Sequence, residues 1–329
     1  MPTPRRVTLV AAILVSALAV VAIPAAAAPA SPITTMKVAL IAPSAHNDLA
    51  FTQSMYAALQ QLKAKYHFQL SVSENQFVVA DAANIMRQYA AEGYNLIIAH
   101  GSQYGGTIQQ LAPKYPKVSF AWGTASSTFN LPNVYAYQAS SNEGGYVQGY
   151  MAALLSKTKV LGVIGPIAVG DAKLYVDGFK AGALAAFPKA TVHVSYTGSF
   201  SDASLMSKQA TNYVAAGADV LTGSSQSVVG AITVAKAKNV AWFGTQWTQA
   251  SLAPKQVVSS QVYDWNGILN QIFTGLEAGK LGGSTYTLTL KNGGEKIALN
   301  PQYELPASVK TAEQKTVAGI ANGTIKVPK

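Results

Sequence analysis

The hydrophobic pattern alternates between short buried strands and amphipathic helices from residue 36 to residue 243. Met36–Ala42 is an apolar run that predicts a buried strand, and apolar residues recur at helical spacing through 47–66. Further strands are predicted at 68–73, 96–99, 118–122, 134–137, 160–164, 191–196, 220–222 and 240–243, with helices at 80–92, 107–115, 143–155, 171–186, 205–216 and 228–238. This alternation is typical of βαβ units with largely parallel sheets.

The alternation falls into two series that divide near residue 140, so the sequence predicts an α/β protein with two Rossmann-like lobes. No low-complexity segment separates the series. We therefore expect several strands to cross between the lobes, rather than one flexible linker. Near the C-terminus, 288–299 contains an Asn-Gly pair between two short runs and predicts a β-hairpin with a structural role.

The first 30 residues have the pattern of a secretory signal peptide. Arg5 and Arg6 precede an apolar run, 7–24, and an Ala-rich stretch, 25–30. This order favours export and cleavage near Ala26–Ala30. An uncleaved membrane anchor is the alternative, because the run approaches the length of a membrane span. The chain has no Cys, which excludes a lipid-anchored Cys, disulfides and thiolate metal sites. We therefore expect a soluble protein, free in the periplasm.

The chain is basic, with 24 Lys and Arg against 14 Asp and Glu. Removing Arg5 and Arg6 with the signal peptide leaves 22 basic and 14 acidic residues, a net charge of +8. Arg87 is then the only Arg, and the Lys residues are scattered singly along the chain. Nucleic-acid binding favours clustered Arg and Lys, so we expect a Lys-coated surface and no nucleic-acid partner.

The residues that follow the predicted strands form the candidate site, since ligands of open parallel sheets bind beyond the carboxyl ends of the strands. These segments contain mostly Ser, Thr, Asn, Gln, Asp, Gly and aromatic residues. Such side chains suit hydrogen bonding and stacking around a small, polar, planar molecule. The segments are 43–51, 100–104, 122–126, 165–171, 198–202, 223–226 and 244–247.

Motifs for catalysis and for cofactors are missing from the sequence. It contains no G-x-G-x-x-G fingerprint after the first strand, no phosphate-binding P-loop and no G-x-S-x-G nucleophile elbow. The four His residues are far apart, and none has the i, i+4 spacing of a metal site. His100 ends a predicted strand and is either a site residue or a packing residue. We expect no cofactor, no metal and no enzymatic activity, although the scattered Asp residues leave an enzyme open.

Asn47–Tyr56 reads NDLAFTQSMY and comes directly after the first predicted strand. It resembles the N-D-x-x-F-x-Q-S signature of the basic membrane protein (BMP) family, and the segments 99–104, 141–149 and 217–221 resemble comparable family segments. The resemblance covers nearly all of the chain after the signal peptide. It implies a type I periplasmic binding protein fold, whose lobes are joined by a multi-strand hinge, and a role as the solute-binding component of an ABC importer.

With this fold, we expect the chain to divide discontinuously between the lobes. Residues 36–139 with about 261–283 form the first lobe, and 140–260 with about 284–329 form the second. The resemblance implies that a small molecule binds in the cleft between the lobes and that their closure buries it. An ABC permease then recognises the closed form, and we expect the binding protein to act as a monomer.

The resemblance also implies a ligand. Family members characteristically bind purine nucleosides, and a narrower branch looks specialised for free bases such as adenine. Phe51 occupies the position where an aromatic ring stacks on the base, and Asn47 and Asp48 occupy positions that read its edge. Taken without the resemblance, Phe51 is better interpreted as a core residue of the first helix.

The chain departs from the nucleoside-binding pattern where charged groups hold the ribose hydroxyls. It lacks the acidic residue after the strand at 118–122 and the Asp within 245–249, and it has Tyr263 or Asp264 in place of a Lys. The stretch 243–265 resembles the base-binding branch in the order of its short motifs. The expected ligand is therefore a purine nucleobase or a related planar heterocycle, held by stacking and by hydrogen bonds.

The candidate ligand-binding residues lie in the strand-end loops and at the family positions. They are Asn47, Asp48, Phe51, Ser102, Gln103, Trp122, Thr124, Phe200, Ser224, Gln226, Thr245, Gln246, Trp247 and Asp264. For each Trp, packing between the lobes is an equal alternative. Other functions stay open: a purine nucleoside-binding protein, a sensory binding protein of the same fold and, less favoured, a secreted nucleosidase-type enzyme. The export signal disfavours the effector domain of a gene regulator.

Overall fold

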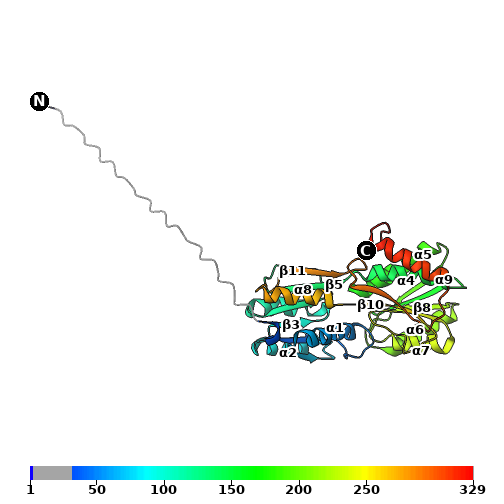
Figure 1. The fold of residues 1–329 in the computed structure, drawn as a ribbon, viewed down its shortest axis with the longest axis horizontal. Helices are drawn as coiled ribbons and strands as arrows, with labels where there is room; N and C mark the ends of the chain where they lie inside the picture. The colour runs from blue at the N-terminus through cyan, green and yellow to red at the C-terminus, as the bar shows by residue number, and fades with distance from the viewer. Residues whose placement is uncertain (3–31, 329) are drawn as a thin grey trace.

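The computed structural model describes residues 1–2 and 32–328, so the predicted signal peptide and its cleavage sites lie almost entirely outside the described residues. Two lobes lie side by side (Figure 1), and each is built on a six-stranded sheet. Strands pair in parallel in both sheets, except for one antiparallel pair at the edge of the second sheet. The predicted α/β class with two similarly built lobes is confirmed.

The first sheet has the strand order β11-β5-β4-β3-β1-β2. Alternate residues of its strands face opposite sides, as the two-residue period of a strand requires. In β1, Val38 and Leu40 pack toward α1 and α8, whereas Ala39 and Ile41 pack toward α2 and α3. The strands are β1 (Lys37–Ile41), β2 (Gln69–Ser73), β3 (Leu96–Ala99), β4 (Ser119–Gly123), β5 (Val134–Ala139) and β11 (Ser284–Leu288); the helices are α1 (Phe51–Tyr66), α2 (Val79–Ala91), α3 (Gly105–Leu111) and α8 (Asn266–Glu277), with short 3-10 turns at Ile33–Thr35, Ser102–Tyr104 and Ala112–Lys114.

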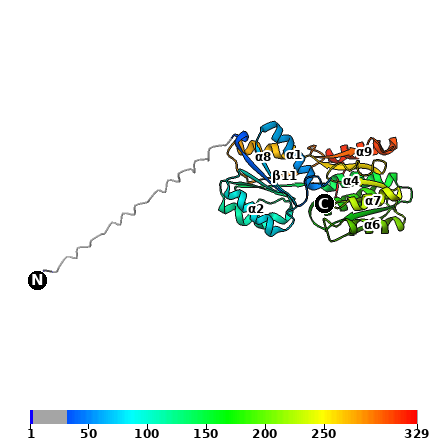
Figure 2. The same cartoon turned by 90° about the horizontal axis from the view of Figure 1, so that it is seen from below.

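The second sheet repeats this plan in the order β12-β10-β9-β8-β6-β7. Helices α4, α5 and α9 pack on one face and α6 and α7 on the other, and Figure 2 shows helices on both sides of each lobe. The strands are β6 (Val160–Gly165), β7 (Thr191–Tyr196), β8 (Val220–Gly223), β9 (Ala241–Gly244), β10 (Val257–Tyr263) and β12 (Glu295–Leu299); the helices are α4 (Ser141–Leu155), α5 (Gly170–Ala186), α6 (Ala203–Ala215), α7 (Val229–Lys238) and α9 (Ala307–Ala321).

Helices α4 and α5 approach each other closely because glycines stand at their contact. A Cβ on Gly149 would lie 1.9 Å from the carbonyl oxygen of Phe179, and a Cβ on Gly182 would lie 2.0 Å from that of Tyr146. Neither position has room for a side chain. The two glycines therefore allow α5 to pack directly on the backbone of α4.

Three segments carry the chain between the lobes, after β5, after β10 and between β11 and β12. They are hydrogen-bonded to one another. The backbone N–H of Ser140 donates to the carbonyl of Leu288 (2.9 Å), that of Asp264 donates to Gly294 (2.7 Å), and the Tyr263 hydroxyl donates to Ser141 Oγ (2.8 Å). The expected multi-strand connection between the lobes is therefore present.

The predicted hairpin at 288–299 is wrong. The turn at Asn292 forms, and its side-chain oxygen accepts hydrogen bonds from the N–H groups of Thr289 and Gly294. However, the strand before the turn, β11, pairs in parallel with β5 of the first sheet, and the strand after it, β12, pairs antiparallel with β10 of the second sheet. The turn therefore joins the lobes. For the same reason Ser284–Leu288, which we expected in the second lobe, lies in the first sheet.

The first helix begins at Phe51 rather than at residue 47, because Asp48 caps its first turn. The Asp48 carboxylate accepts hydrogen bonds from the backbone N–H groups of Ala50 (2.9 Å), Thr52 (3.1 Å) and Gln53 (3.1 Å). A carboxylate in this place satisfies N–H groups that have no partner within the helix. Within the part of the chain that the structure describes, no helix has both the length and the apolar character needed to cross a membrane.

Candidate functional site

A cavity of about 290 Å³ lies between the two lobes, at the carboxyl ends of the strands of both sheets. This is near the lower end of the range of about 300–1,000 Å³ for small-molecule pockets. Both lobes contribute loops to its wall. The lining residues are Pro43, Phe51, Phe77, Gly101, Ser102, Gln103 and Thr124 from the first lobe, and Ile167, Val169, Gly170, Asp171, Ala172, Phe200, Ser224, Ser225, Gln226 and Gln246 from the second.

The first-lobe wall is centred on Phe51, the first residue of α1. Its ring stacks on the imidazole of His100, with ring centroids 3.7 Å apart and planes inclined by 10°. The Trp265 ring meets the His100 ring edge-on at 5.6 Å, and Trp265 Nε1 donates to Ser54 Oγ (2.9 Å). Phe51 is 7% exposed, so it belongs to the first-lobe core and also lines the cavity. Phe51 can therefore be both a core residue of the first helix and a residue of the cavity wall.

His100 is a neutral packing residue behind this wall. Burial lowers the pKa of its imidazole to about 3, despite the opposing effect of a hydrogen bond to the Phe51 carbonyl. That carbonyl, 3.2 Å from Nε2, can only accept, so Nε2 carries the proton. Nδ1 then accepts from the Tyr137 hydroxyl at 2.8 Å. The imidazole thus holds Phe51 both by its ring face and by its N–H.

The second-lobe wall carries acceptor atoms without partners. Asp171 Oδ2, Gln226 Oε1 and Gln246 Oε1 are buried and make no hydrogen bond, and all three residues line the cavity. Asp171 is the second residue of α5 and is 5% exposed. Burial raises the pKa of its carboxyl to about 7, although a hydrogen bond from the Ala139 backbone lowers it. Three buried acceptors next to the cavity therefore have no partner within the described part of the protein.

The lobes touch around the cavity. A Cβ on Gly170 of the second lobe would lie 2.7 Å from Thr124 Cγ2 of the first, so only glycine allows this approach. Gln249 Nε2 donates to the carbonyl of Leu49 across the cleft (3.2 Å). At the rim, the rings of Phe77 and Phe200 lie 6.0 Å apart. The structure therefore has the lobes closed over the cavity.

Eight of the expected residues line this cavity. Thr124 and Gln246 do so with left-handed backbone, at φ values of 56° and 67°. Phe200 is held by Ser225, whose hydroxyl donates to the Phe200 carbonyl (2.7 Å). The eight residues are Phe51, Ser102, Gln103, Thr124, Phe200, Ser224, Gln226 and Gln246.

The other six expected residues do not line the cavity. Asn47 is exposed, and Asp48 uses its carboxylate to cap α1. Trp122 stacks on Phe129, with centroids 4.8 Å apart, and its Nε1 donates to the carbonyl of Gly101 (3.2 Å). These side chains stabilise the loops of the first lobe.

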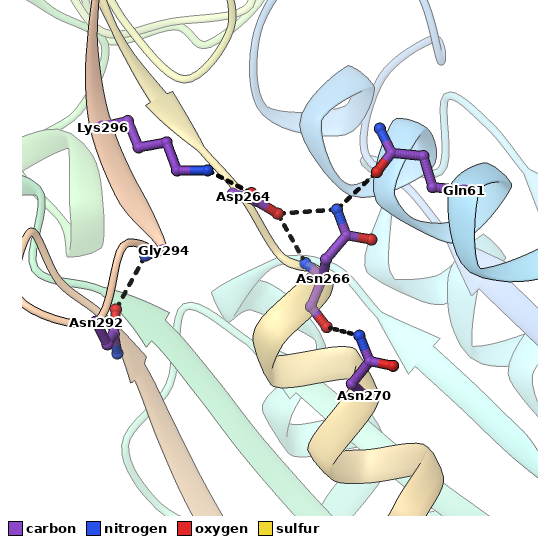
Figure 3. Close-up of polar contacts among 7 residues, drawn as sticks. All are labelled: Gln61, Asp264, Asn266, Asn270, Asn292, Gly294 and Lys296. Carbon is purple, nitrogen blue, oxygen red and sulfur yellow. Dashed lines mark hydrogen bonds and ion pairs between the residues drawn. The ribbon is translucent and has the colours of Figure 1, made fainter. Parts of the chain in front are cut away.

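The side chains of three further expected residues make contacts outside the cavity, namely Thr245, Trp247 and Asp264. The Thr245 hydroxyl donates to the carbonyl of Gly223 (3.0 Å), and Trp247 lies over α1 in a separate hollow. Figure 3 shows that Asp264 faces Lys296 and Asn266 where β10 leads into α8. Its carboxylate lies 2.7 Å from Lys296 Nζ. Asp264 is therefore part of the connection between the lobes.

The geometry agrees with comparisons to known proteins. Residues 35–329 match the family described as Bmp, ABC transporter substrate-binding protein PnrA-like. The chain belongs to this family. A purine-binding protein of Brucella abortus is 27% identical over 296 residues, 88% of this chain and 82% of that protein. An ABC transporter nucleoside-binding protein of Lactococcus lactis is 26% identical over 318 residues, 90% of each chain.

A solved structure confirms the fold of this Bmp family member. The ABC transporter solute-binding protein of Conexibacter woesei superposes with a TM-score of 0.75 at 24% sequence identity, over 89% of this chain and 99% of that one. The expected type I periplasmic binding protein fold is thus confirmed. Membership in the Bmp family makes the chain a substrate-binding protein of an ABC transporter, which implies a small-molecule ligand and a permease partner.

Sequence reasoning missed several residues of the site in this Bmp protein, above all Asp171. The segment 165–171 is among the predicted strand-end loops, but no spacing or motif in it indicates that a carboxylate would be buried. Phe77 was missed as well, and Ile167 and Val169 fall in the predicted segment 165–171 without being singled out. Their exposed fractions of 49%, 37% and 47% place the three residues at the rim. Among the described residues, no cluster of His, Asp and Glu could hold a metal ion.

Proposed function

We propose that the protein binds a purine nucleobase, or a related planar heterocycle, in the cavity between its lobes and delivers it to the permease of an ABC importer. The observation that carries this proposal is the Phe51 ring, which is held flat against His100 and lines the cavity. A rigid aromatic wall offers a stacking surface for a planar ring, and such stacking contributes roughly 1–3 kcal/mol in nucleic-acid binders.

The charges around the cavity argue against an anionic ligand. None of the described residues that line it is Lys, Arg or His, and one, Asp171, carries a carboxyl group. A phosphate or a carboxylate would have no cation to pair with, and burying an unpaired charge is costly. The cavity therefore suits an uncharged heterocycle better than a nucleotide.

The relatives support a purine, and the residues of the cavity support the base over the nucleoside. The Brucella abortus relative is a purine-binding protein and the Lactococcus lactis relative is a nucleoside-binding protein. In the nucleoside-binding pattern described above, charged groups beside the base hold the ribose hydroxyls. Here Thr124 lines the first-lobe side of the cavity, and Asp264 is paired with Lys296 outside it. The small volume of the cavity also favours the smaller molecule.

In the proposed cycle, the ligand first lands on one lobe, and closure of the cleft then buries it. Contacts across the cleft, such as Gln249 with Leu49, would form only on closure and would distinguish the closed form for the permease. The protein acts as an exported monomer in the periplasm, where it takes up the ligand for import.

Calorimetry on refolded protein, freed of carried-over ligand, tests this proposal. We expect a purine base to bind more tightly than its nucleoside, and sugars and amino acids to give no heat. Phe51→Ala is expected to lose this binding, whereas Phe187→Ala, a half-exposed Phe at the end of α5, is expected to keep it. Tighter binding of nucleosides would refute the preference for a base, and silence toward every purine and pyrimidine would refute the ligand class.

A further inference from the structure

Asp171 lines the cavity, and one of its carboxylate oxygens has no hydrogen-bond partner. It stands in the first turn of α5, between Gly170 and Ala172, which also line the cavity. A hydrogen bond from the backbone of Ala139, at the end of β5, holds the carboxylate from the first-lobe side. Oδ2 is buried and has no partner. The side chain is therefore fixed in orientation, and one acceptor is left over.

No nearby group in the protein compensates this oxygen. None of the ion pairs within the described part of the chain involves Asp171. The titratable side chains that interact with it electrostatically are Tyr137 of β5, Tyr263 of β10 and Glu295 of β12, none of which becomes a cation. A buried acceptor without a hydrogen bond destabilises the folded state, so its presence at a ligand cavity indicates that the ligand supplies the donor.

The chemistry of a carboxylate fixes what it accepts. An ionised carboxylate has only acceptor atoms, whereas a glutamine amide can turn to present either an acceptor or two donors. Gln226 and Gln246 can therefore adapt to several ligand edges, but Asp171 cannot. Phe51 on the opposite wall offers a ring face and no polar atom.

We infer that Asp171 is the specificity-determining residue of the cavity and that its free carboxylate oxygen accepts a hydrogen bond from an N–H group of the bound heterocycle. This inference rests on the proposed function. In a purine, the donor is the imidazole-ring N–H at N9 or N7, an exocyclic amine, as in adenine and guanine, or the ring N1–H of an oxo-purine such as guanine or hypoxanthine. A donor at N9 excludes nucleosides, in which ribose replaces that hydrogen, and an amine donor excludes hypoxanthine and xanthine, which have no exocyclic amine.

Protonation gives this interaction a pH dependence. Burial raises the pKa of the Asp171 carboxyl to about 7, and a protonated carboxyl places a hydrogen where the ligand N–H must approach. Affinity should therefore fall as the pH drops from 8 to 5 in the wild-type protein. The same drop in pH should leave the affinity of Asp171→Asn nearly unchanged, because that side chain does not titrate.

A cycle between protein and ligand variants tests the inference. Calorimetry at pH 8 would compare adenine and guanine with derivatives that lack one donor each, namely the N9-methyl bases, N1-methylguanine and the bases dimethylated at the exocyclic amine, on the wild-type protein, Asp171→Asn and Asp171→Ala. We expect one methylation to weaken binding to the wild type by roughly ten- to hundredfold, the range for a hydrogen bond to a charged group. On Asp171→Ala, the same methylation should cost less than threefold.

Controls separate this inference from folding and from the proposed function. Thermal unfolding of each variant without ligand checks the fold, and Asp177→Asn, on the exposed face of the same helix, should bind as the wild type does. If Phe51→Ala loses binding but both Asp171 variants keep the wild-type ratios between bases and methylated bases, the inference is overturned and the proposed function stands. If neither base binds the wild-type protein, both fail together.

Discussion

Phe51 and Asp171 occupy corresponding places in the two lobes, yet they bring opposite chemistry to the cavity. β1 and β6 hold the same position in their sheets, since the orders β4-β3-β1-β2 and β9-β8-β6-β7 match. The helix after β1 begins with Phe51, and the helix after β6 has Asp171 as its second residue. A repeated backbone plan thus places an aromatic ring at this position in one lobe and a carboxyl group in the other.

The two positions also differ in what they do for the folded state. Phe51 packs in the first-lobe core, where His100 covers its ring, so the side chain that we propose for stacking also stabilises the lobe. Asp171 is buried with an unpartnered oxygen, so it destabilises the protein that it equips for binding. Such opposition between stability and function is common at binding sites. The contributions of Phe51 and Asp171 can therefore be distinguished by measuring stability and affinity on the same variants.

The largest effect is expected for the aromatic wall. Phe51→Ala should lower the free energy of unfolding of the ligand-free protein by about 3–5 kcal/mol, because it leaves a cavity in the core and uncovers His100. Phe77→Ala, at the half-exposed rim, should change it by less than about 1 kcal/mol. Urea denaturation measures both. Equal losses for the two variants would show that Phe51 does not differ from a rim residue.

Asp171→Asn should raise the free energy of unfolding, and the size of this gain should depend on pH. The folded-state pKa of about 7 lies above the ordinary 3.8, so the folded protein binds more protons than the unfolded chain between these values. The wild type should therefore lose stability relative to Asp171→Asn as the pH rises from 4 to 7, by roughly 4 kcal/mol at most. Denaturation at pH 4, 6 and 8 measures the difference, and a constant difference would contradict the burial of an uncompensated carboxyl.

The next largest change in stability is expected at the contact between α4 and α5, the helix that carries Asp171. Gly182→Ala places a methyl group against the Tyr146 carbonyl, so it should push α5 from α4 and lower the free energy of unfolding by roughly 2–3 kcal/mol. Gly267→Ala in α8, where no atom lies within 4 Å of the new Cβ, should instead raise it by up to about 1 kcal/mol. A loss of similar size in both variants would show that crowding at the Tyr146 carbonyl does not explain the effect of Gly182→Ala.

The smallest effect is expected at Asp264, the carboxylate expected in the site but found outside it. Burial would raise the pKa of Asp264, but hydrogen bonds from Lys296 and Asn266 outweigh it and lower the pKa. The pair is partly exposed, so Asp264→Asn should cost less than about 1 kcal/mol of stability and change base affinity by less than twofold. Calorimetry and denaturation measure these. A large loss of affinity would return Asp264 to the site.

Local patterns in the sequence were sufficient to predict most of the strands and helices and some of the residues that line the cavity. Hydrophobic patterns predicted β1 to β9 near their observed positions, since central strands buried on both faces are apolar throughout, but they did not predict β10 or the placement of β11 and β12. The strand-end rule selected the loops that line the cavity, including those of Gln103 and Gln226. The segments that become α8 and α9 lie beyond residue 243, where the alternation of strands and helices no longer guides the assignment.

Contacts between distant parts of the chain decided the strand pairing near the C-terminus and the surroundings of the Asp side chains. Asn292 and its neighbours form the expected turn, but the strands on either side pair with β5 and with β10, which lie far away in the chain. Asp48 and Asp171 look alike as polar residues near helix starts. The folded chain aims the first at the N–H groups of α1 and the second into the cavity.

By itself, the sequence determined the α/β class, the two lobes, the family and an aromatic residue that lines the cavity, because these depend on periodicity and on short motifs. Only the tertiary structure decided which carboxylate is buried without a partner and which lobe each edge strand joins. Burial and pairing depend on atoms that approach from distant parts of the chain. For this reason Asp171, which carries no signature in the sequence, is the residue that the structure adds to the site.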